Sequence, residues 1–149
     1  MKRITDYRKL FGITKDADLA ELKTIYRNLM KEWHPDKFQE GDPMKEQAAV
    51  KGQEIITAYH FLVSISEETH TLNKDEYANT INNSGIDDFI YKGQTLKVTF
   101  HDGSVYEYFG VPKNLYNKFL NSTTQTRFAR RHIFESFPRR KTLKVAEQE

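Results

Sequence analysis

The chain has 149 residues, a net charge of +2, 38% hydrophobic residues and no cysteine. This length is enough for one medium-sized domain or two small ones, and the hydrophobic share is large enough to form cores. The lack of cysteine excludes disulfides, thiol catalysis and cysteine-ligated zinc. No run of about 20 apolar residues could span a membrane, and the first residues lack the apolar stretch of a signal peptide, so we expect a cytoplasmic protein without membrane contact.

Helical periodicity dominates residues 1–65. A short first helix is predicted over residues 6–10, and Gly12 ends it, because glycine accepts the left-handed conformation that follows a helix. A second helix begins at Asp18, which together with Glu21 has the Asp-x-x-Glu form of a capping box. Apolar residues then recur at spacings of three and four and form one stripe. These residues are Leu19, Leu22, Tyr26, Leu29 and Trp33.

A third helix is predicted over residues 43–63, and the connection before it, residues 34–42, is short enough to make the two helices antiparallel. His34, Pro35 and Asp36 occupy the start of this connection. Proline fits there because its ring clashes with a preceding helical turn and it has no N–H to donate. An exposed loop on a rigid helical hairpin is a common place for recognition, so we expect a docking region and not an active site.

A basic stripe follows one side of the second helix. Lys23, Arg27 and Lys31 recur every four residues, well away from the apolar stripe. Charge alone leaves two interpretations open, because such a stripe is compatible with a solvated face and with a surface that meets an acidic partner.

The first region resembles the J domain, the DnaJ-type co-chaperone module, in the order and spacing of its residues. The matching residues are Asp6, Tyr7, Leu10, Phe11, Gly12, Ile13, Ala17, Leu22, Lys23, Tyr26, Arg27, Leu29, Trp33, His34, Pro35, Asp36, Lys37, Ile55, Ala58, Tyr59 and Leu62. The resemblance implies that the chain is a partner of a DnaK-type (heat-shock seventy) chaperone and that it is no enzyme and needs no cofactor. In agreement, the five histidines show no metal-ligand spacing and there is no glycine-rich phosphate loop.

The same resemblance assigns roles to individual residues. His34, Pro35 and Asp36 would trigger ATP hydrolysis in the partner, with Asp36 pairing with a partner cation. Lys23, Arg27, Lys31 and Lys37 would steer and hold the encounter. Family members often carry basic residues where this chain has Thr24, Asn28 and Glu32, so we expect weaker electrostatic association here.

Residues 66–83 are polar and are predicted to be a linker, within which residues 74–81 are compatible with a short helix. A strand follows in which Leu96, Val98 and Phe100 alternate with polar residues. After a turn at residues 101–103, a second strand covers residues 104–109. An upstream strand over residues 86–91 would complete a three-stranded meander.

Two registers are compatible with this hairpin. A two-residue loop pairs Val98 with Glu107 and places a charge on the apolar face. A three-residue loop with a left-handed Gly103 pairs Val98 with Tyr106, and Lys97 with Glu107. We favour the three-residue loop because it gathers the apolar side chains on one face and places an ion pair on the other.

Two helices are predicted next. Pro112 suits the first helical position, and Ser122 with Gln125 forms a capping box that opens a helix over residues 123–137, ended by Pro138. The fold class is therefore α+β. We expect an all-α domain at residues 1–65, a polar linker at 66–83, a β-meander with two helices at 84–138, and a disordered, basic then acidic tail at 139–149.

The second region resembles the KTSC domain, a small module found alone in bacterial proteins and at the C-terminus of some lysyl-tRNA synthetases. The matching residues are Leu96, Val98, Phe100, Gly103, Tyr106, Glu107, Tyr108, Gly110, Val111, Pro112, Tyr116, Arg127, Phe128, Arg131, His132 and Ile133. The family often has glycine at the position of Thr126 and asparagine at the position of Arg130. The synthetase context suggests an association with nucleic acid.

Basic residues gather at this end of the chain, namely Arg127, Arg130, Arg131, His132, Arg139, Arg140, Lys141 and Lys144. One interpretation is a phosphate-facing patch for RNA or DNA, with Tyr106 and Tyr108 available for base stacking. The other, which we favour, is solvated charge beside tyrosines that belong to the core. The sequence therefore predicts a co-chaperone whose C-terminal domain supplies an unknown client or a location, with a nucleic-acid-binding accessory protein as the alternative.

Overall fold

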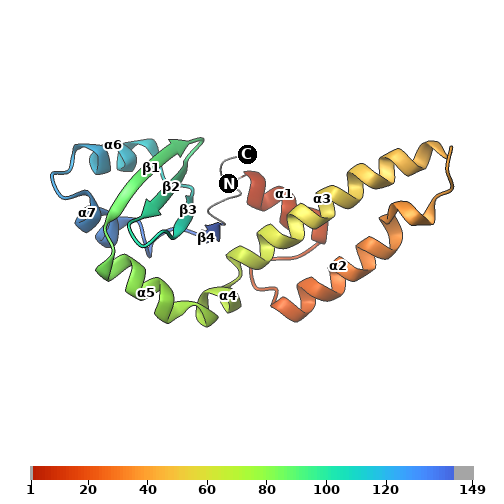
Figure 1. The fold of residues 1–149 in the computed structure, drawn as a ribbon, viewed down its shortest axis with the longest axis horizontal. Coiled ribbons are helices and arrows are strands. Elements are labelled where there is room, and N and C mark those ends of the chain that lie inside the picture. Colours follow the sequence, from red (N-terminus) through yellow and green to blue (C-terminus); the bar gives the residue numbers. More distant parts are fainter. Residues whose placement is uncertain (1, 143–149) are drawn as a thin grey trace. The chain divides into compact units, whose positions relative to one another are not determined.

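A computed structural model describes residues 2–142 of the chain (Figure 1). The chain divides into two compact units, Met1–Thr71 and Leu72–Glu149. The first unit is helical and the second combines a sheet with helices, so the predicted α+β class is confirmed. No helix among residues 2–142 is both long and apolar enough to cross a bilayer.

The first unit is built from helices with clear stop and start signals. Its elements are α1 (Lys2–Phe11), α2 (Leu19–Trp33), the 3-10 turn η1 (Pro35–Lys37), α3 (Pro43–Ile65) and α4 (Glu67–Leu72). Gly12 follows α1 with φ +65°, as predicted. At the start of α2, Asp18 Oδ1 accepts a hydrogen bond from the Glu21 N–H at 2.8 Å, which confirms the predicted N-cap. Asp42 caps α3 in the same way, by accepting from the Met44 N–H at 2.8 Å.

Helices α2 and α3 form the antiparallel hairpin that the sequence predicts (Figure 1). Leu22 of α2 and Ile55 of α3 are almost completely buried. The Tyr26 and Tyr59 rings stack across the hairpin with centroids 4.2 Å apart. Helix α1 packs against α3, where the Tyr7 ring meets the edge of Phe61 at 5.2 Å. The packed hairpin thus holds both ends of the loop that connects its two helices.

Residues 66–83 correct the prediction of a polar linker, because they form two helices, the second of which contains the short helix expected over residues 74–81. Helix α4 belongs with the first unit, where Glu68 Oε1 accepts from the Leu19 N–H at 3.2 Å. Helix α5 (Lys74–Asn83) buries Tyr77, Thr80 and Ile81 in the second unit. These three residues lie at i, i+3 and i+4, on one face of a helix. Because most other residues of the segment are polar, its composition gives no sign that this narrow face is buried.

The second unit contains a four-stranded antiparallel sheet. Its strands are β1 (Ile86–Lys92), β2 (Thr95–Phe100), β3 (Val105–Phe109) and β4 (Arg139–Thr142), in that spatial order. Val98 pairs with Tyr106, and Lys97 with Glu107, so the favoured three-residue loop is confirmed. Gly103 has φ +91°, as that loop requires.

Strand β4 corrects a second prediction, that residues 139–149 are a disordered tail. Residues 139–142 pair with β3, which places Arg140 opposite Glu107 and Arg139 opposite Tyr108. A strand whose side chains are mostly charged has no apolar alternation to reveal it. The rest of the expected tail, residues 143–149 with Lys144, lies outside the described residues.

Helices α6 (Lys113–Asn121) and α7 (Gln125–His132) follow the sheet hairpin. Pro112 is the N-cap of α6 and not its first residue. Helix α7 ends five residues before the predicted end at residue 137. The reason is that Ile133 and Phe134 are adjacent and both fully buried. Successive helical side chains point about 100° apart, so leaving the helix lets both side chains enter the core.

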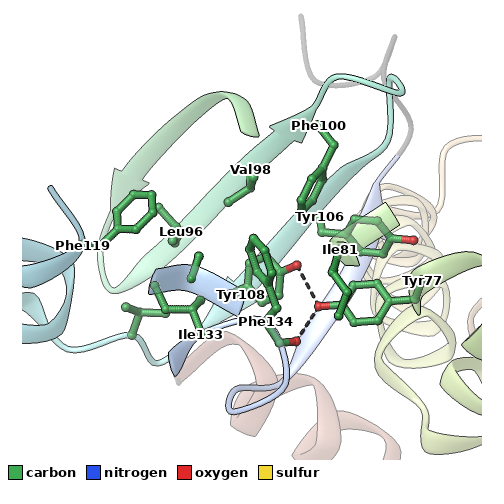
Figure 2. Packing of buried hydrophobic residues seen from close by; sticks show 12 residues of the cluster. Tyr77, Ile81, Leu96, Val98, Phe100, Tyr106, Tyr108, Phe119, Ile133 and Phe134 are labelled. Carbon is green, nitrogen blue, oxygen red and sulfur yellow. Dashed lines mark hydrogen bonds between the residues drawn. The ribbon is translucent and has the colours of Figure 1, made fainter. Parts of the chain in front are cut away.

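The core of the second unit lies between one sheet face and the helices (Figure 2). Leu96, Val98 and Phe100 of β2 contribute the sheet side, with Tyr106 and Tyr108 of β3. The helical side includes residues of α5, α6 and α7 and the segment after α7. These residues are Tyr77, Ile81, Phe119, Ala129, Ile133 and Phe134.

The burial of Ile81 generates a test of the role of α5. We expect Ile81→Ala to lower the free energy of unfolding of the second unit by about 2–5 kcal/mol, because the change removes buried methylene groups and leaves a cavity. Asn82→Ala, at the neighbouring exposed position, should change it by less than about 0.5 kcal/mol. Urea denaturation followed through the NMR amide signals of β2 and β3 measures both. Equal stability of the two variants would contradict a core role for α5.

Candidate functional site

The loop between α2 and α3 holds its polar side chains in a defined arrangement. His34 caps α2 by donating its backbone N–H to the Met30 carbonyl at 2.9 Å. The Asp36 N–H donates to His34 Nδ1 at 3.2 Å, so in the neutral ring the proton sits on Nε2. The Lys37 N–H closes the turn on the His34 carbonyl at 3.0 Å. These hydrogen bonds therefore hold the His34 ring and the backbone of residues 34–37 in one arrangement.

The Asp36 carboxylate is highly exposed to solvent. Its side chain is 89% exposed, against 49% for His34, and its Oδ2 lies 3.6 Å from His34 Nδ1. The 3-10 turn η1, which carries Asp36, packs against α3. The structure thus presents a carboxylate to solvent from a turn that the hairpin supports.

A groove of roughly 970 Å³ lies beside this loop, between α2 and α3. Its apolar lining comes from Tyr26, Met30 and Ile56. Its polar lining is cationic or titratable and comes from Arg27, Lys31, His34 and Lys37. No carboxylate is among the lining residues. The groove is therefore chemically suited to an apolar segment that carries acidic groups.

The groove brings together most of the predicted docking residues of the first unit. Lys23 lies outside the lining; it is exposed on α2 one turn before Arg27. Pro35 opens η1. Met30 and Ile56 were missed by the sequence analysis, because neither belongs to the apolar stripe that packs the hairpin. The signal that could have found them is a second, weaker apolar line beside that stripe.

Four of the basic residues predicted to contact nucleic acid contact the protein itself. Arg130 Nε donates to the Ile81 carbonyl at 2.9 Å, so it binds the C-terminal end of α5. Arg140 pairs with Glu107 at 2.9 Å, and Lys141 pairs with Glu76. The Arg139 guanidinium carbon lies 3.7 Å from the centre of the Tyr77 ring, a cation–π contact. Arg127 and Arg131, four residues apart on α7, are exposed.

The two tyrosines predicted as stacking platforms face the core. Tyr106 and Tyr108 are 4% and 0% exposed, so neither ring is accessible to a base in this structure. The Tyr77 hydroxyl donates to the Phe134 carbonyl and lies 2.9 Å from the Tyr108 hydroxyl (Figure 2). The Tyr106 hydroxyl points away from this pair and has no hydrogen-bond partner among the described residues.

Burial changes the acidity of this tyrosine cluster. It raises the pKa of Tyr106 to about 12, with smaller contributions from the negative charges of Glu76 and Asp102. Burial also raises the pKa of Tyr77 and Tyr108. All three rings are therefore neutral at physiological pH. Within residues 2–142 no three His, Asp or Glu side chains gather to hold a metal ion.

Comparison with known proteins assigns each unit to a family. Residues 6–70 match the family model described as DnaJ domain, and residues 82–137 match the model described as KTSC domain. Three relatives are similar to part of this chain. The chain is 44% identical over 59 residues to the chaperone protein DnaJ of Hydrogenobacter thermophilus, 38% over 73 residues to that of Mesomycoplasma hyopneumoniae, and 39% over 61 residues to the DnaJ protein homolog XDJ1 of Saccharomyces cerevisiae.

These similarities cover 40%, 48% and 41% of this chain, respectively. They cover only 15%, 19% and 13% of the relatives. Each similarity therefore spans less than half of this chain and less than a fifth of the relative.

The tyrosine cluster generates a matched pair of stability tests. We expect Tyr77→Phe to lower the free energy of unfolding by about 1–3 kcal/mol, because it leaves the buried Tyr108 hydroxyl and Phe134 carbonyl without their partner. Tyr106→Phe should cause no loss and a gain of up to about 1 kcal/mol, because it removes a buried hydroxyl without a partner. Urea denaturation at pH 7 measures both. A larger loss in Tyr106→Phe than in Tyr77→Phe would contradict these assignments.

The raised pKa of Tyr106 also predicts a pH dependence. The folded state holds the neutral phenol, so its stabilising effect is complete below the ordinary pKa of 10.0 and is lost as the pH rises toward about 12. We expect the second unit to lose stability over this range, and Tyr106→Phe to lose less. Urea denaturation curves of the parent and of Tyr106→Phe, recorded between about pH 9 and pH 12, test whether the two proteins lose stability to different extents. Parallel losses in the two proteins would exclude Tyr106 as a source.

Proposed function

Because residues 6–70 form a J domain and residues 82–137 a KTSC domain, we propose that this chain is a co-chaperone that recruits and activates a DnaK-type (heat-shock seventy) ATPase through the loop and groove of its first unit. A J domain implies heat-shock seventy co-chaperone activity, and proteins of this kind are typically not enzymes themselves. The observation that carries the proposal is the continuity of the groove with the turn at residues 34–37, since both contain His34 and Lys37.

Association would begin with the cations of the groove. Arg27, Lys31 and Lys37 surround apolar surface without a neighbouring carboxylate in the lining. Positive charges around the groove attract an acidic partner surface and raise the rate of association. Burial of Met30 and Ile56 under the partner would then supply apolar contact area, which slows dissociation.

Asp36 would be the residue that activates ATP hydrolysis in the partner. Its carboxylate is exposed in the free chain, so a partner cation can reach it without unfolding of the loop. A charge-assisted hydrogen bond to a partner guanidinium or ammonium would favour the hydrolysing state of the ATPase. The effect is a coupling free energy between docking here and hydrolysis in the partner, so no bond is made or broken on this chain.

The KTSC domain would supply a client or a location. Because the two domains are covalently connected, a client bound to the KTSC domain and an ATPase bound to the J domain would be held close together. The effective concentration of the ATPase near the client would then be high. The second unit has its own core and sheet, so it can present a binding surface independently of the first.

Single-turnover ATP hydrolysis by the host's DnaK-type chaperone tests the proposal. We expect stimulation by the parent chain and a return to the basal rate with His34→Gln or Asp36→Asn. The paired change Arg27→Ala with Lys31→Ala should raise the half-maximal concentration about tenfold while the maximal rate remains, because these cations act mainly on association.

A charge-matched control separates a specific effect from net charge. Lys9→Ala with Lys15→Ala removes the same charge at two exposed positions outside the groove, and should leave the half-maximal concentration unchanged. Stimulation that survives Asp36→Asn, or an equal loss in the control pair, would refute the assigned mode of docking.

A further inference from the structure

Strand β1 is an edge of the sheet. In the sheet formed by the described residues, β1 pairs with β2 alone. It is seven residues long, and its fifth residue, Ile90, is 59% exposed. An edge strand of this length with an exposed apolar side chain is open to pairing with another strand unless charges prevent it.

The hairpin fixes which backbone groups of β1 face outward. A two-residue turn, Gly93 and Gln94, joins β1 to β2, so its flanking residues Lys92 and Thr95 form a hydrogen-bonded pair. Hydrogen-bonded and non-bonded pairs alternate along an antiparallel ladder, so the backbone groups of Phe89 and Tyr91 point to the free edge. In agreement, the Phe89 N–H is bound by its neighbour Asp88, whose Oδ1 accepts at 2.9 Å.

The sequence of this edge is complementary to itself in the antiparallel direction. It reads Asp88, Phe89, Ile90, Tyr91, Lys92. We propose that β1 pairs with β1 of a second copy of this chain about a two-fold axis at Ile90. Asp88 then lies opposite Lys92 of the second copy, and each Phe89 opposite a Tyr91. The two Ile90 side chains meet at the axis.

The backbone directions agree with this register. The outward-facing residues Phe89 and Tyr91 become the hydrogen-bonded pairs of the new ladder. Ile90 and the Asp88–Lys92 pairs fall at non-bonded positions, where opposing side chains lie closer together. The Asp88 carboxylate exchanges the Phe89 N–H for the ammonium of Lys92 in the second copy, and that N–H gains a backbone carbonyl.

Neighbouring registers are disfavoured by charge. Only shifts of two residues in the pairing keep the outward-facing groups in hydrogen-bonded positions. One such shift places Asp88 opposite Ile90, and the other places Lys92 opposite Ile90. Each removes both ion pairs and sets an exposed isoleucine against a charge. Charged side chains on an edge strand normally prevent pairing with other strands. Here the positions of Asp88 and Lys92 favour pairing with an identical antiparallel strand, because opposite charges then face one another.

The strand is already ordered for pairing. The Tyr91 ring stacks on Tyr116 of α6 with centroids 4.0 Å apart, and its hydroxyl donates to the Val111 carbonyl at 2.6 Å. The Phe89 ring meets the edge of Phe119 at 4.9 Å. A strand held in this way loses little conformational entropy when it binds.

The resulting dimer would join the two sheets into one and would carry two J domains. The interface is isologous, with the same strand on both sides, so it closes at two copies. A client with two binding sites would be held more tightly by such a dimer than by a single chain. This inference concerns the second unit and is independent of the proposed ATPase partner.

Sedimentation equilibrium of the full chain over a concentration series tests the inference. We expect the mean mass of the parent to rise from 17.6 kDa toward twice that value. Asp88→Lys and Lys92→Asp should each weaken the dimer about tenfold or more, because each places like charges opposite one another twice. The double change, Asp88→Lys with Lys92→Asp, restores opposite charges and should recover the parental dissociation constant.

Two further variants complete the experiment. Ile90→Lys should weaken the dimer, because it places two ammonium groups at the axis, whereas Lys15→Asp in the first unit should leave it unchanged. Melting temperatures close to the parent's confirm that each variant is folded. A parent that stays monomeric at every concentration overturns the inference. Dimerisation insensitive to Ile90→Lys, or a double variant as weak as the singles, likewise overturns it.

Discussion

The close packing of α2 against α3 is the constraint on which the first unit depends. Ala48, Ile55 and Ala58 of α3 are fully buried, and two of the three are small enough to let the helices approach closely. The stack of Tyr26 on Tyr59 adds a large flat contact to this seam. Because both ends of the connecting loop are fixed by the hairpin, a short loop has few conformations left. His34 and Asp36 are therefore held in place before any partner binds.

The same packing creates the groove beside the loop. Tyr26 contributes one part of its ring to the seam and remains part of the groove lining, where it lies with Met30 and Ile56. The cations Arg27 and Lys31 extend from the outer side of the same helix. A single helix thus supplies packing, apolar contact area and charge, because its three faces differ in composition.

The second unit uses its charges differently. Arg130, Arg139 and Arg140 are directed at a helix end, an aromatic ring and a carboxylate of the protein itself. These contacts fasten α5 and β4 to the rest of the unit. A cluster of cations in the sequence was thus divided by the fold into structural contacts and a smaller exposed remainder on α7. On β1, by contrast, Asp88 and Lys92 stay exposed, on a strand that forms an edge of the sheet made by residues 86–142.

Local chemistry was enough to predict much of this architecture. The cap at Asp18, the left-handed Gly12 and the hairpin of α2 and α3 follow from residues close in sequence. The register of β2 and β3 was also predictable, because only one loop length pairs Lys97 with Glu107 and keeps charge off the apolar face. The His34–Asp36 turn was found in the same way, since its spacing within a helical hairpin is a local pattern.

The remaining features depend on contacts between residues far apart in the chain. Helix α5 is part of a core because Tyr77 reaches Tyr108 and Phe134, and β4 forms because Arg140 meets Glu107. The end of α7 is set by the burial of Ile133 and Phe134, and the groove by Ile56 lying across from Met30. The sequence by itself determined which segments are helices and strands wherever hydrophobic periodicity was strong. Only the tertiary structure decided the rest, because charged and polar segments adopt regular structure when distant partners satisfy them.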